Sequence, residues 1–387
     1  MALKFDCPIA YWSARTPDAL AIDGLTYRAL DALVTGCMSQ IKEKRIAFIA
    51  HRTPLTLALF FACFRMQAIA CPLSPRLPQD AVQEALQKLG TPLFTPAFQM
   101  HAGEWKQQLD GASDATLLFT SSKAKIALHT LANHFISAHH AIRLLQLDQS
   151  SRTLLSLPLN HVGGLAACIR SLIAGGTLIE DEESATHISY VPTQLYRLNK
   201  ALPHLKCLLI GGAALREKVP GLPLHISYGM TETSSFIAFD SRPIPETEIK
   251  IVDGEIWVRG PTVFKGYLDQ ESPFVDGWFP TRDMGAYEEG KLEWKGRKDR
   301  RFKAGGETIQ PEEIEEEILR IPGILHAHIT PMSDPEFGFL PKAQIYGKEI
   351  PLEELQAILR RRLPGYKIPR TVEFIDDPSF FLSKAKD

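Results

Sequence analysis

The alternation of short apolar runs with helical segments is the feature that most constrains the fold of this chain. Runs rich in β-branched or aliphatic residues are typical of buried strands, and they occur at Ile46–Ile49, Thr116–Phe119, Thr153–Leu157, Thr177–Ile179, Ile188–Val191 and Cys207–Ile210. Helical patterns lie between many of them, at Pro54–Phe64, Ala132–Leu147 and Gly164–Ala174. Strands that alternate with helices usually pair in parallel, so the pattern predicts an α/β protein with a large layered N-terminal domain.

The sequence changes in character after Glu248, where short strands separated by turns predict a small β-rich subregion. It changes again further on. Pro311 begins an acidic helix, a second helix runs from about Pro351 to Arg362, and apolar runs lie between them. We therefore expect a small α+β domain over residues 299–387, after an N-terminal domain over residues 1–298, with a boundary near Asp299.

Composition narrows the class of protein. A chain of 387 residues exceeds the usual size of a single core, and 45% hydrophobic with 23% charged residues is ordinary for a globular protein. The formal charge of −2 gives no electrostatic reason to expect nucleic acid or an anionic membrane as a partner. Arg65 and Gln67 interrupt the longest apolar run, Leu55–Leu73, which predicts a buried helix and strand rather than membrane insertion.

The six cysteines are scattered without a CxxC pair, mostly in apolar runs. This suits buried, reduced thiols. No basic and apolar leader opens the sequence, so we expect no signal peptide and a cytoplasmic protein. The sequence does not indicate an oligomeric state.

Two segments contain the residue types that a nucleotide site needs. In Gly277–Gly306, Asp283 is expected in a turn, followed by Arg297 and by the pair Gly305–Gly306. A carboxylate can bind a ribose diol, an arginine can add a second contact, and glycines let backbone approach a ligand closely. Both charges could instead be ordinary surface residues.

The second segment is Ser227–Ser235, SYGMTETSS, which follows LLIGGAAL at Leu208–Leu215. Tyr228 can stack on an adenine, Thr231 can donate to a phosphate, and Glu232 can hold a magnesium ion. Taken alone, LLIGGAAL favours a simple tight turn from strand to helix over a ligand site.

Together these segments resemble the adenylate-forming superfamily of acyl-CoA synthetases. The resemblance implies an acid–thiol ligase that uses ATP, Mg²⁺ and CoA and forms an acyl-adenylate intermediate. It assigns the adenine and α-phosphate site to Gly211, Gly212, Ala213, Tyr228, Gly229, Thr231 and Glu232. Glu232 would be the metal ligand.

The same resemblance assigns roles in the C-terminal part of the chain. Asp283 would hold the ribose hydroxyls with Arg297 beside it, although Arg282 stands where the family usually has a glycine. Asp299 would be the hinge about which the small domain rotates between the two half-reactions. Gly305 and Gly306 would then contact the pantetheine arm of CoA.

A lysine near the C-terminus would be catalytic. Lys384 lies six residues after Pro378, at the family's spacing, with Ser383 in place of a glycine. Its ammonium would offset negative charge in the adenylation transition state. Lys386 is the alternative.

The main departure from the family lies in the phosphate loop, which normally reads Thr-Ser-Gly-Thr-Thr-Gly-x-Pro-Lys. Thr120, Ser121 and Lys125 can be placed, but the loop is shorter here and has no glycine. Either Ser121, Ser122, Lys123 and Lys125 bind pyrophosphate in a reduced way, or ATP use is weakened.

The acid substrate is indicated by Leu155–Gly164, LSLPLNHVGG, and the helix after it. His161 stands where the family has a histidine beside the acyl pocket, with a catalytic or substrate-binding role, and Ser234 and Ser235 could line the same pocket. Arg170 interrupts an apolar helix face and should meet an anion there, either a substrate carboxylate or a core carboxylate.

Within the superfamily the chain is most similar to the 2-succinylbenzoate–CoA ligases of menaquinone synthesis, in which Arg170 would bind the second carboxylate of the acid. Another aryl- or acyl-CoA ligase, and a degenerate homologue that binds nucleotide or acyl ligand without catalysis, are the alternatives.

Overall fold

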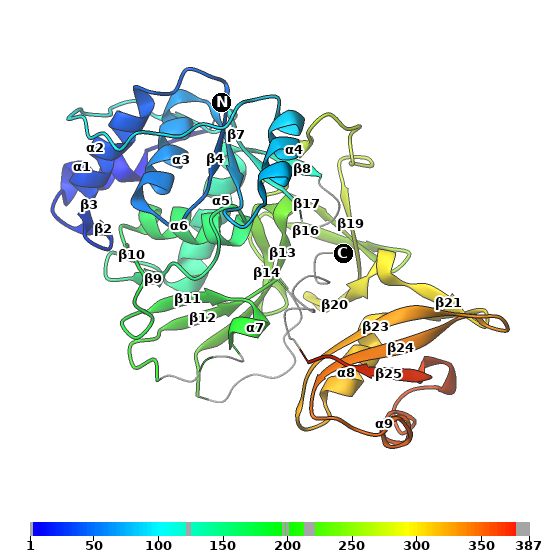
Figure 1. Cartoon of the computed structure of the whole chain (residues 1–387). Coiled ribbons are helices and arrows are strands. Elements are labelled where there is room, and N and C mark those ends of the chain that lie inside the picture. The colour runs from blue at the N-terminus through cyan, green and yellow to red at the C-terminus, as the bar shows by residue number, and fades with distance from the viewer. Residues whose placement is uncertain (1–2, 121–124, 196–197, 199–200, 213–220, 377–387) are drawn as a thin grey trace. The chain divides into compact units, whose positions relative to one another are not determined.

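The computed structural model describes residues 3–120, 125–195, 198, 201–212 and 221–376 (Figure 1). The chain divides into two compact units. The first comprises the described residues of Met1–Thr120, Ala124–Glu248 and Arg259–Gly277. The second contains Ile249–Val258 and the described residues of Trp278–Asp387.

The first unit contains a five-stranded sheet with the order β18-β8-β7-β5-β4. Its strands are β4 (Arg45–Ile49), β5 (Ile69–Leu73), β7 (Asp114–Phe119), β8 (Ile126–Thr130) and β18 (Gly266–Tyr267). The β4–β5 and β5–β7 pairs are parallel, whereas β8 pairs antiparallel with both β7 and β18. Residues 266–267 are thereby held beside a strand that lies far earlier in the sequence.

A nine-stranded sheet in the same unit has the order β15-β14-β13-β12-β11-β9-β10-β2-β3. Its strands are β2 (Leu20–Ile22), β3 (Leu25–Thr26), β9 (Arg152–Leu154), β10 (Thr177–Ile179), β11 (His187–Tyr190), β12 (Cys207–Ile210), β13 (Leu224–Met230), β14 (Ser235–Phe239) and β15 (Arg242–Pro243). The strands from β2 to β13 in this order pair in parallel, and β14, β15 and β3 are antiparallel additions. The carboxyl ends of the parallel strands therefore meet at one edge, where ligands commonly bind in such sheets.

Helices of the first unit share one core with strands of both sheets. They are α1 (Pro8–Arg15), α2 (Tyr27–Met38), α3 (Pro54–Met66), α5 (Leu131–Leu145) and α6 (Val162–Ala174). Phe48 of β4 and Leu178 of β10 both belong to this core. The remaining helices are α4 (Gln79–Leu89), which packs on the five-stranded sheet in a separate core, and α7 (Pro192–Leu195), which packs with strands β11 and β12. This is the layered α/β arrangement that the sequence predicts.

The second unit begins with a four-stranded sheet of order β16-β17-β19-β20. Its strands are β16 (Glu248–Val252), β17 (Glu255–Arg259), β19 (Phe279–Glu288) and β20 (Lys291–Arg297). Then follow β21 (Phe302–Ala304), β22 (Glu307–Ile309), α8 (Pro311–Leu319), β23 (Ile324–Asp334), β24 (Gly338–Gly347), α9 (Leu352–Leu359) and β25 (Thr371–Phe374). Apolar residues of α8, α9, β23 and β24 form one core, as expected for an α+β region.

Short elements complete the described chain: β1 (Lys4–Phe5), β6 (Leu109–Asp110) and the 3-10 turns Thr231–Thr233, Lys298–Arg300 and Gly365–Lys367. The expectation for the cysteines is met. All six cysteines are buried and unpaired. Within the described residues, no helix has the length and apolar character needed to cross a membrane. The boundary between residues 298 and 299 and the hinge at Asp299 stay predictions.

Candidate active site

The carboxyl edge of the nine-stranded sheet gathers several of the predicted residues. Gly211 follows β12 directly, and its N–H donates to the carbonyl of Tyr190 at the end of β11 (3.1 Å). The neighbouring strand β13 continues past this point and contains Tyr228 and Gly229. Parallel pairing thus brings residues 211–212 and 228–229 to the ends of adjacent strands. Ala213 lies outside the described residues.

Gly229 is required by the close approach of the neighbouring strand β14. A Cβ at this position would lie 2.1 Å from the carbonyl oxygen of Ser235, which no side chain tolerates. The β13–β14 pairing shifts register between Tyr228 and Gly229, and the chain then forms the 3-10 turn that contains Thr231 and Glu232. The glycine of the YGMTE motif therefore has a packing role, whatever it does toward a nucleotide.

Glu232 is held by hydrogen bonds to its backbone and its side chain. Its carbonyl accepts from the N–H of Phe264 (2.8 Å), and its Oε1 accepts from the hydroxyl of Tyr267 (2.7 Å). Mg²⁺ is commonly bound by one or two carboxylates together with substrate phosphates, and a single oriented glutamate fits that chemistry. Among the described residues, no group of three or more His, Cys, Asp or Glu side chains could hold a metal ion.

The neighbouring Thr231 is anchored by a buried histidine. The Nε2–H of His129 donates to the carbonyl of Thr231 (2.7 Å), and Thr116 Oγ1 lies 2.8 Å from Nε2 of His134. Burial lowers the pKa of His129 to about 4, because the charged imidazolium would lose its hydration. The same cause lowers the pKa of His134 well below its ordinary value. Both rings are therefore neutral at physiological pH.

Arg170 is buried in α6 beside a serine of β11. Arg170 is only 3% exposed, and its Nη2 donates to Oγ of Ser189 (2.6 Å). Burial lowers the pKa of Arg170 to about 10. The expected alternative, a core carboxylate paired with Arg170, is not found among the described residues. Among the described residues, this buried guanidinium bonds to a hydroxyl and to no carboxylate, so it is suited to receive a substrate anion.

Two further residues of the predicted acyl pocket occupy different environments. His161 is the N-cap residue of α6 and is exposed. Ser234 follows the 3-10 turn in the left-handed conformation (φ 57°) and is fully buried. Its Oγ has no hydrogen-bond partner among the described residues, and its carbonyl accepts from Oγ of Ser137 (3.3 Å). A polar ligand atom could satisfy the Ser234 hydroxyl.

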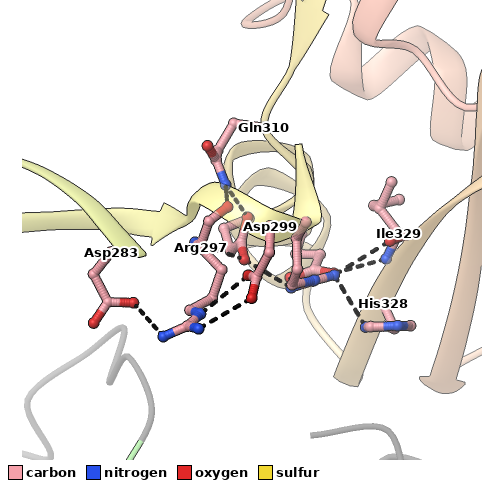
Figure 2. Close-up of polar contacts among 9 residues, drawn as sticks. Asp283, Arg297, Asp299, Gln310, His328 and Ile329 are labelled. Carbon is pink, nitrogen blue, oxygen red and sulfur yellow. Dashed lines mark hydrogen bonds and ion pairs between the residues drawn. The ribbon is translucent and has the colours of Figure 1, made fainter. Parts of the chain in front are cut away.

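The second unit brings together Asp283, Arg297 and Asp299 (Figure 2). Asp283 lies within strand β19, not in the expected turn, because it faces Arg297 in the β19–β20 ladder. Arg297 Nη1 donates to Asp283 Oδ1 (3.1 Å), while its Nε and Nη2 donate to the two carboxylate oxygens of Asp299 (3.2 and 3.1 Å). Burial opposes the charge of Arg297, but the two aspartates outweigh it and raise its pKa.

Arg282 has the backbone conformation that a glycine would favour. Its φ is +62°, in the left-handed region, and its N–H donates to Oε1 of Glu255 (2.9 Å). Arg282 thus adopts, before Asp283, a backbone conformation that a glycine adopts more readily.

The segment after Arg297 is tied to helix α8. Arg300 donates to Glu312 (2.9 Å) and to Glu315 (2.6 Å), and it also reaches His328 and the carbonyl of Ile329 (both 3.2 Å; Figure 2). Hydrogen bonds from His328 and Arg300 outweigh burial and lower the pKa of Glu315 to about 2. The predicted hinge residue Asp299 thus lies between two anchored arginines.

Gly305 and Gly306 form the turn of the β21–β22 hairpin. Both have positive φ values, 56° and 87°, which only glycine adopts readily in succession. The N–H of Gly305 donates to the carbonyl of Phe337 (2.9 Å).

The phosphate loop is described only at its two ends. The N–H of Thr120 donates to the carbonyl of Lys125 (2.9 Å), and Nζ of Lys125 lies 4.5 Å from the ring centroid of Tyr267. Ser121, Ser122, Lys123, Ser383, Lys384 and Lys386 lie outside the described residues. Their roles stay predictions.

Three neighbours of the site were not found by sequence reasoning: Ser189, Tyr267 and His129. Ser189 is a polar residue inside a predicted apolar strand, which is a detectable signal. Tyr267 and His129 contact residues 35 and 102 positions away, and no local pattern indicates such pairs.

Comparisons with known proteins identify the family. The sequence profile of the AMP-binding enzyme family matches residues 95–268. The chain is 33% identical to the 2-succinylbenzoate–CoA ligase of Escherichia coli (strain K12), over 87% of each chain. The chain belongs to the 2-succinylbenzoate–CoA ligase family.

Solved structures of this family share the fold. One is o-succinylbenzoate CoA synthetase (MenE) from Bacillus subtilis in complex with the acyl-adenylate intermediate OSB-AMP, with a TM-score of 0.85 and 25% identity, covering 97% of this chain and 95% of that one. The same enzyme in complex with ATP and magnesium ion has a TM-score of 0.85 and 26% identity, covering 97% and 96%. The predictions of an adenylate-forming fold and of membership in this ligase family are confirmed.

Proposed function

We propose that this protein is a cytoplasmic, ATP-dependent 2-succinylbenzoate–CoA ligase of menaquinone biosynthesis. The similarity to ligases of this name extends over most of the chain. The observation that carries the choice of acid is the buried guanidinium of Arg170, bonded to Ser189. An aromatic acid with a second carboxylate supplies the anion that this cation needs.

In the first half-reaction the acid carboxylate attacks the α-phosphorus of ATP and pyrophosphate leaves. Tyr228 and Gly211–Gly212 receive the adenine, Asp283 accepts hydrogen bonds from the ribose hydroxyls, and Thr231 donates to the α-phosphate. Glu232 would hold Mg²⁺, which would supply positive charge to neutralise the phosphate oxygens. Lys384 offsets the charge that develops as the acyl phosphate bond forms.

In the second half-reaction the CoA thiol attacks the acyl carbonyl and AMP leaves. Rotation about Asp299 withdraws Lys384 and brings Gly305–Gly306 against the pantetheine arm. No covalent bond to the protein is required, because the acyl-adenylate is already the activated species. The C–S bond forms as the C–O bond between the acyl carbon and the AMP phosphate breaks, AMP leaves with the electron pair of that bond, and the thiol proton passes to solvent.

The test is an end-product assay with purified protein, 2-succinylbenzoate, ATP, Mg²⁺ and CoA. We expect AMP, pyrophosphate and the acyl-CoA thioester in equal amounts, with none formed when the acid is omitted. Turnover only with monocarboxylic aromatic acids would point to the alternative aryl-CoA ligase. ATP binding without pyrophosphate release, both with 2-succinylbenzoate and with monocarboxylic aromatic acids, would point to a degenerate homologue.

A further inference from the structure

One short segment, residues 264–267, contacts Glu232 at two points. Phe264 donates its N–H to the Glu232 carbonyl (2.8 Å), and the Tyr267 hydroxyl donates to Glu232 Oε1 (2.7 Å). Among the described residues, Tyr267 is the only side chain with a hydrogen bond to this carboxylate. The glutamate that we assign to the metal is therefore oriented by one tyrosine.

The orientation of Tyr267 is itself fixed. Strand β18 pairs with β8, with Tyr267 opposite Ala127, and the N–H of Leu268 donates to Ile126 (2.8 Å). The Phe264 ring meets the Tyr267 ring edge-on, with centroids 4.9 Å apart. A partly buried ring held by a strand and an aromatic neighbour keeps its hydroxyl in one place.

The face of the same ring lies under a lysine of the phosphate loop. Nζ of Lys125 is 4.5 Å from the Tyr267 centroid, within the range of a cation–π interaction. Lys125 directly precedes β8, the strand on which Tyr267 is held. Tyr267 thus contacts the metal-site carboxylate through its hydroxyl and the loop ammonium through its ring.

We propose that Tyr267 is a positioning residue that sets Glu232 and Lys125 for binding of magnesium–ATP. The inference rests on the proposed function for the roles of Glu232 and Lys125. A carboxylate that binds the cation and an ammonium that binds the phosphates must both face the same triphosphate. In a loop without glycines, where backbone N–H groups are less free to wrap phosphates, a side chain that fixes Lys125 gains importance.

Two substitutions separate the two contacts. Tyr267→Phe keeps the ring under Lys125 and removes the hydroxyl, so we expect roughly tenfold weaker ATP binding at limiting Mg²⁺ and near-normal binding at saturating Mg²⁺. Tyr267→Leu removes both contacts, and its ATP affinity should stay low even at saturating Mg²⁺. The measurement is the dissociation constant of ATP by calorimetry across a Mg²⁺ series, without acid or CoA.

Tyr11→Phe is a matched control, because Arg15 lies 3.6 Å over the Tyr11 ring in helix α1, away from the site. It should bind ATP as the unmodified protein does. The proposal would be overturned if Tyr267→Phe and the unmodified protein had the same dissociation constant for ATP at every Mg²⁺ concentration. An equal loss at all concentrations, accompanied by a lower melting temperature, would show a structural role instead and would also overturn it.

A double-mutant cycle gives a second test of the link to Lys125. Lys125→Met and Tyr267→Leu should each weaken ATP binding, and the double variant should lose less than the product of the two single losses. Strictly multiplicative losses would contradict the coupling. ATP binding is measured without acid, so these results can be interpreted even if the substrate assignment is wrong. In that case the protein would bind magnesium–ATP as described but would not activate 2-succinylbenzoate.

Discussion

Arg297 and Asp283 face each other across strands β19 and β20, with Nη1 donating to Oδ1 at 3.1 Å. The same guanidinium bonds both carboxylate oxygens of Asp299. One arginine therefore links the proposed ribose-binding aspartate to the proposed hinge residue. Asp283 is 5% exposed, so its buried carboxylate depends on the Arg297 guanidinium for its charge to be tolerated.

Asp283→Asn should raise the KM for ATP about tenfold or more, because an amide is a weaker acceptor for two ribose hydroxyls than a carboxylate. The KM is measured by pyrophosphate release at saturating acid. Asp253→Asn, at an exposed position between β16 and β17, is the control. An unchanged KM for Asp283→Asn would leave Asp283 with only a structural role, as the buried ion-pair partner of Arg297.

Glu232→Gln should impair magnesium-dependent ATP use while the fold is retained. The substitution removes one charge but keeps the size of the side chain and its ability to accept from Tyr267. Adenylation rates are measured as a function of Mg²⁺ concentration, and the midpoint should move to higher Mg²⁺. A normal rate with a normal midpoint would remove Glu232 from the metal site.

Acid should destabilise the first unit through His129. Its pKa is about 4 in the folded protein and about 6.5 when unfolded, so the unfolded chain binds more protons between these values. The contribution of His129 to the free energy of unfolding is therefore fully present above pH 6.5. It is lost as the pH drops toward 4, and the loss amounts to about 3 kcal/mol.

Thermal melts between pH 7 and pH 4 test this expectation. His129→Gln should melt at a lower temperature at pH 7 but lose less stability on acidification than the unmodified protein. His204→Gln, at an exposed position, should leave the pH dependence as it is. If His129→Gln loses as much stability on acidification as the unmodified protein, another group is responsible.

Lys384→Ala should abolish adenylate formation and leave CoA transfer from supplied acyl-adenylate largely intact. The expectation comes from the sequence, through the spacing of Lys384 from Pro378. Pyrophosphate release and thioester formation are followed separately. Equal loss in both half-reactions, or loss in neither, would move the catalytic role to Lys386.

The sequence predicted what depends on local pattern. The runs at Thr177–Ile179 and Cys207–Ile210 are strands with those same bounds, and the helix expected from Pro54 begins there. The predicted strand Thr153–Leu157 ends earlier, at Leu154. Side-chain preferences of neighbouring residues determine such elements, so they can be read from short windows.

Contacts between distant residues could not be predicted in this way. The Ser189 hydroxyl beside Arg170 and the Tyr267 hydroxyl on Glu232 exist only because strand order brings them together. Asp283 was expected in a turn, yet pairing with β20 makes it part of a strand. Tertiary pairing overrides local preference at such positions.

If Arg170 selects an aromatic acid with a second carboxylate, kcat/KM for two enzymes and two acids will show this most directly. The enzymes are the unmodified protein and Arg170→Ala, and the acids are 2-succinylbenzoate and an analogue that lacks the second carboxylate. Loss of a buried charge-assisted pair should lower kcat/KM for 2-succinylbenzoate by roughly thirty- to a thousand-fold. The analogue should react poorly with the unmodified protein and lose little more on mutation, whereas parallel losses for both acids would contradict the claim and make Arg170 a structural residue.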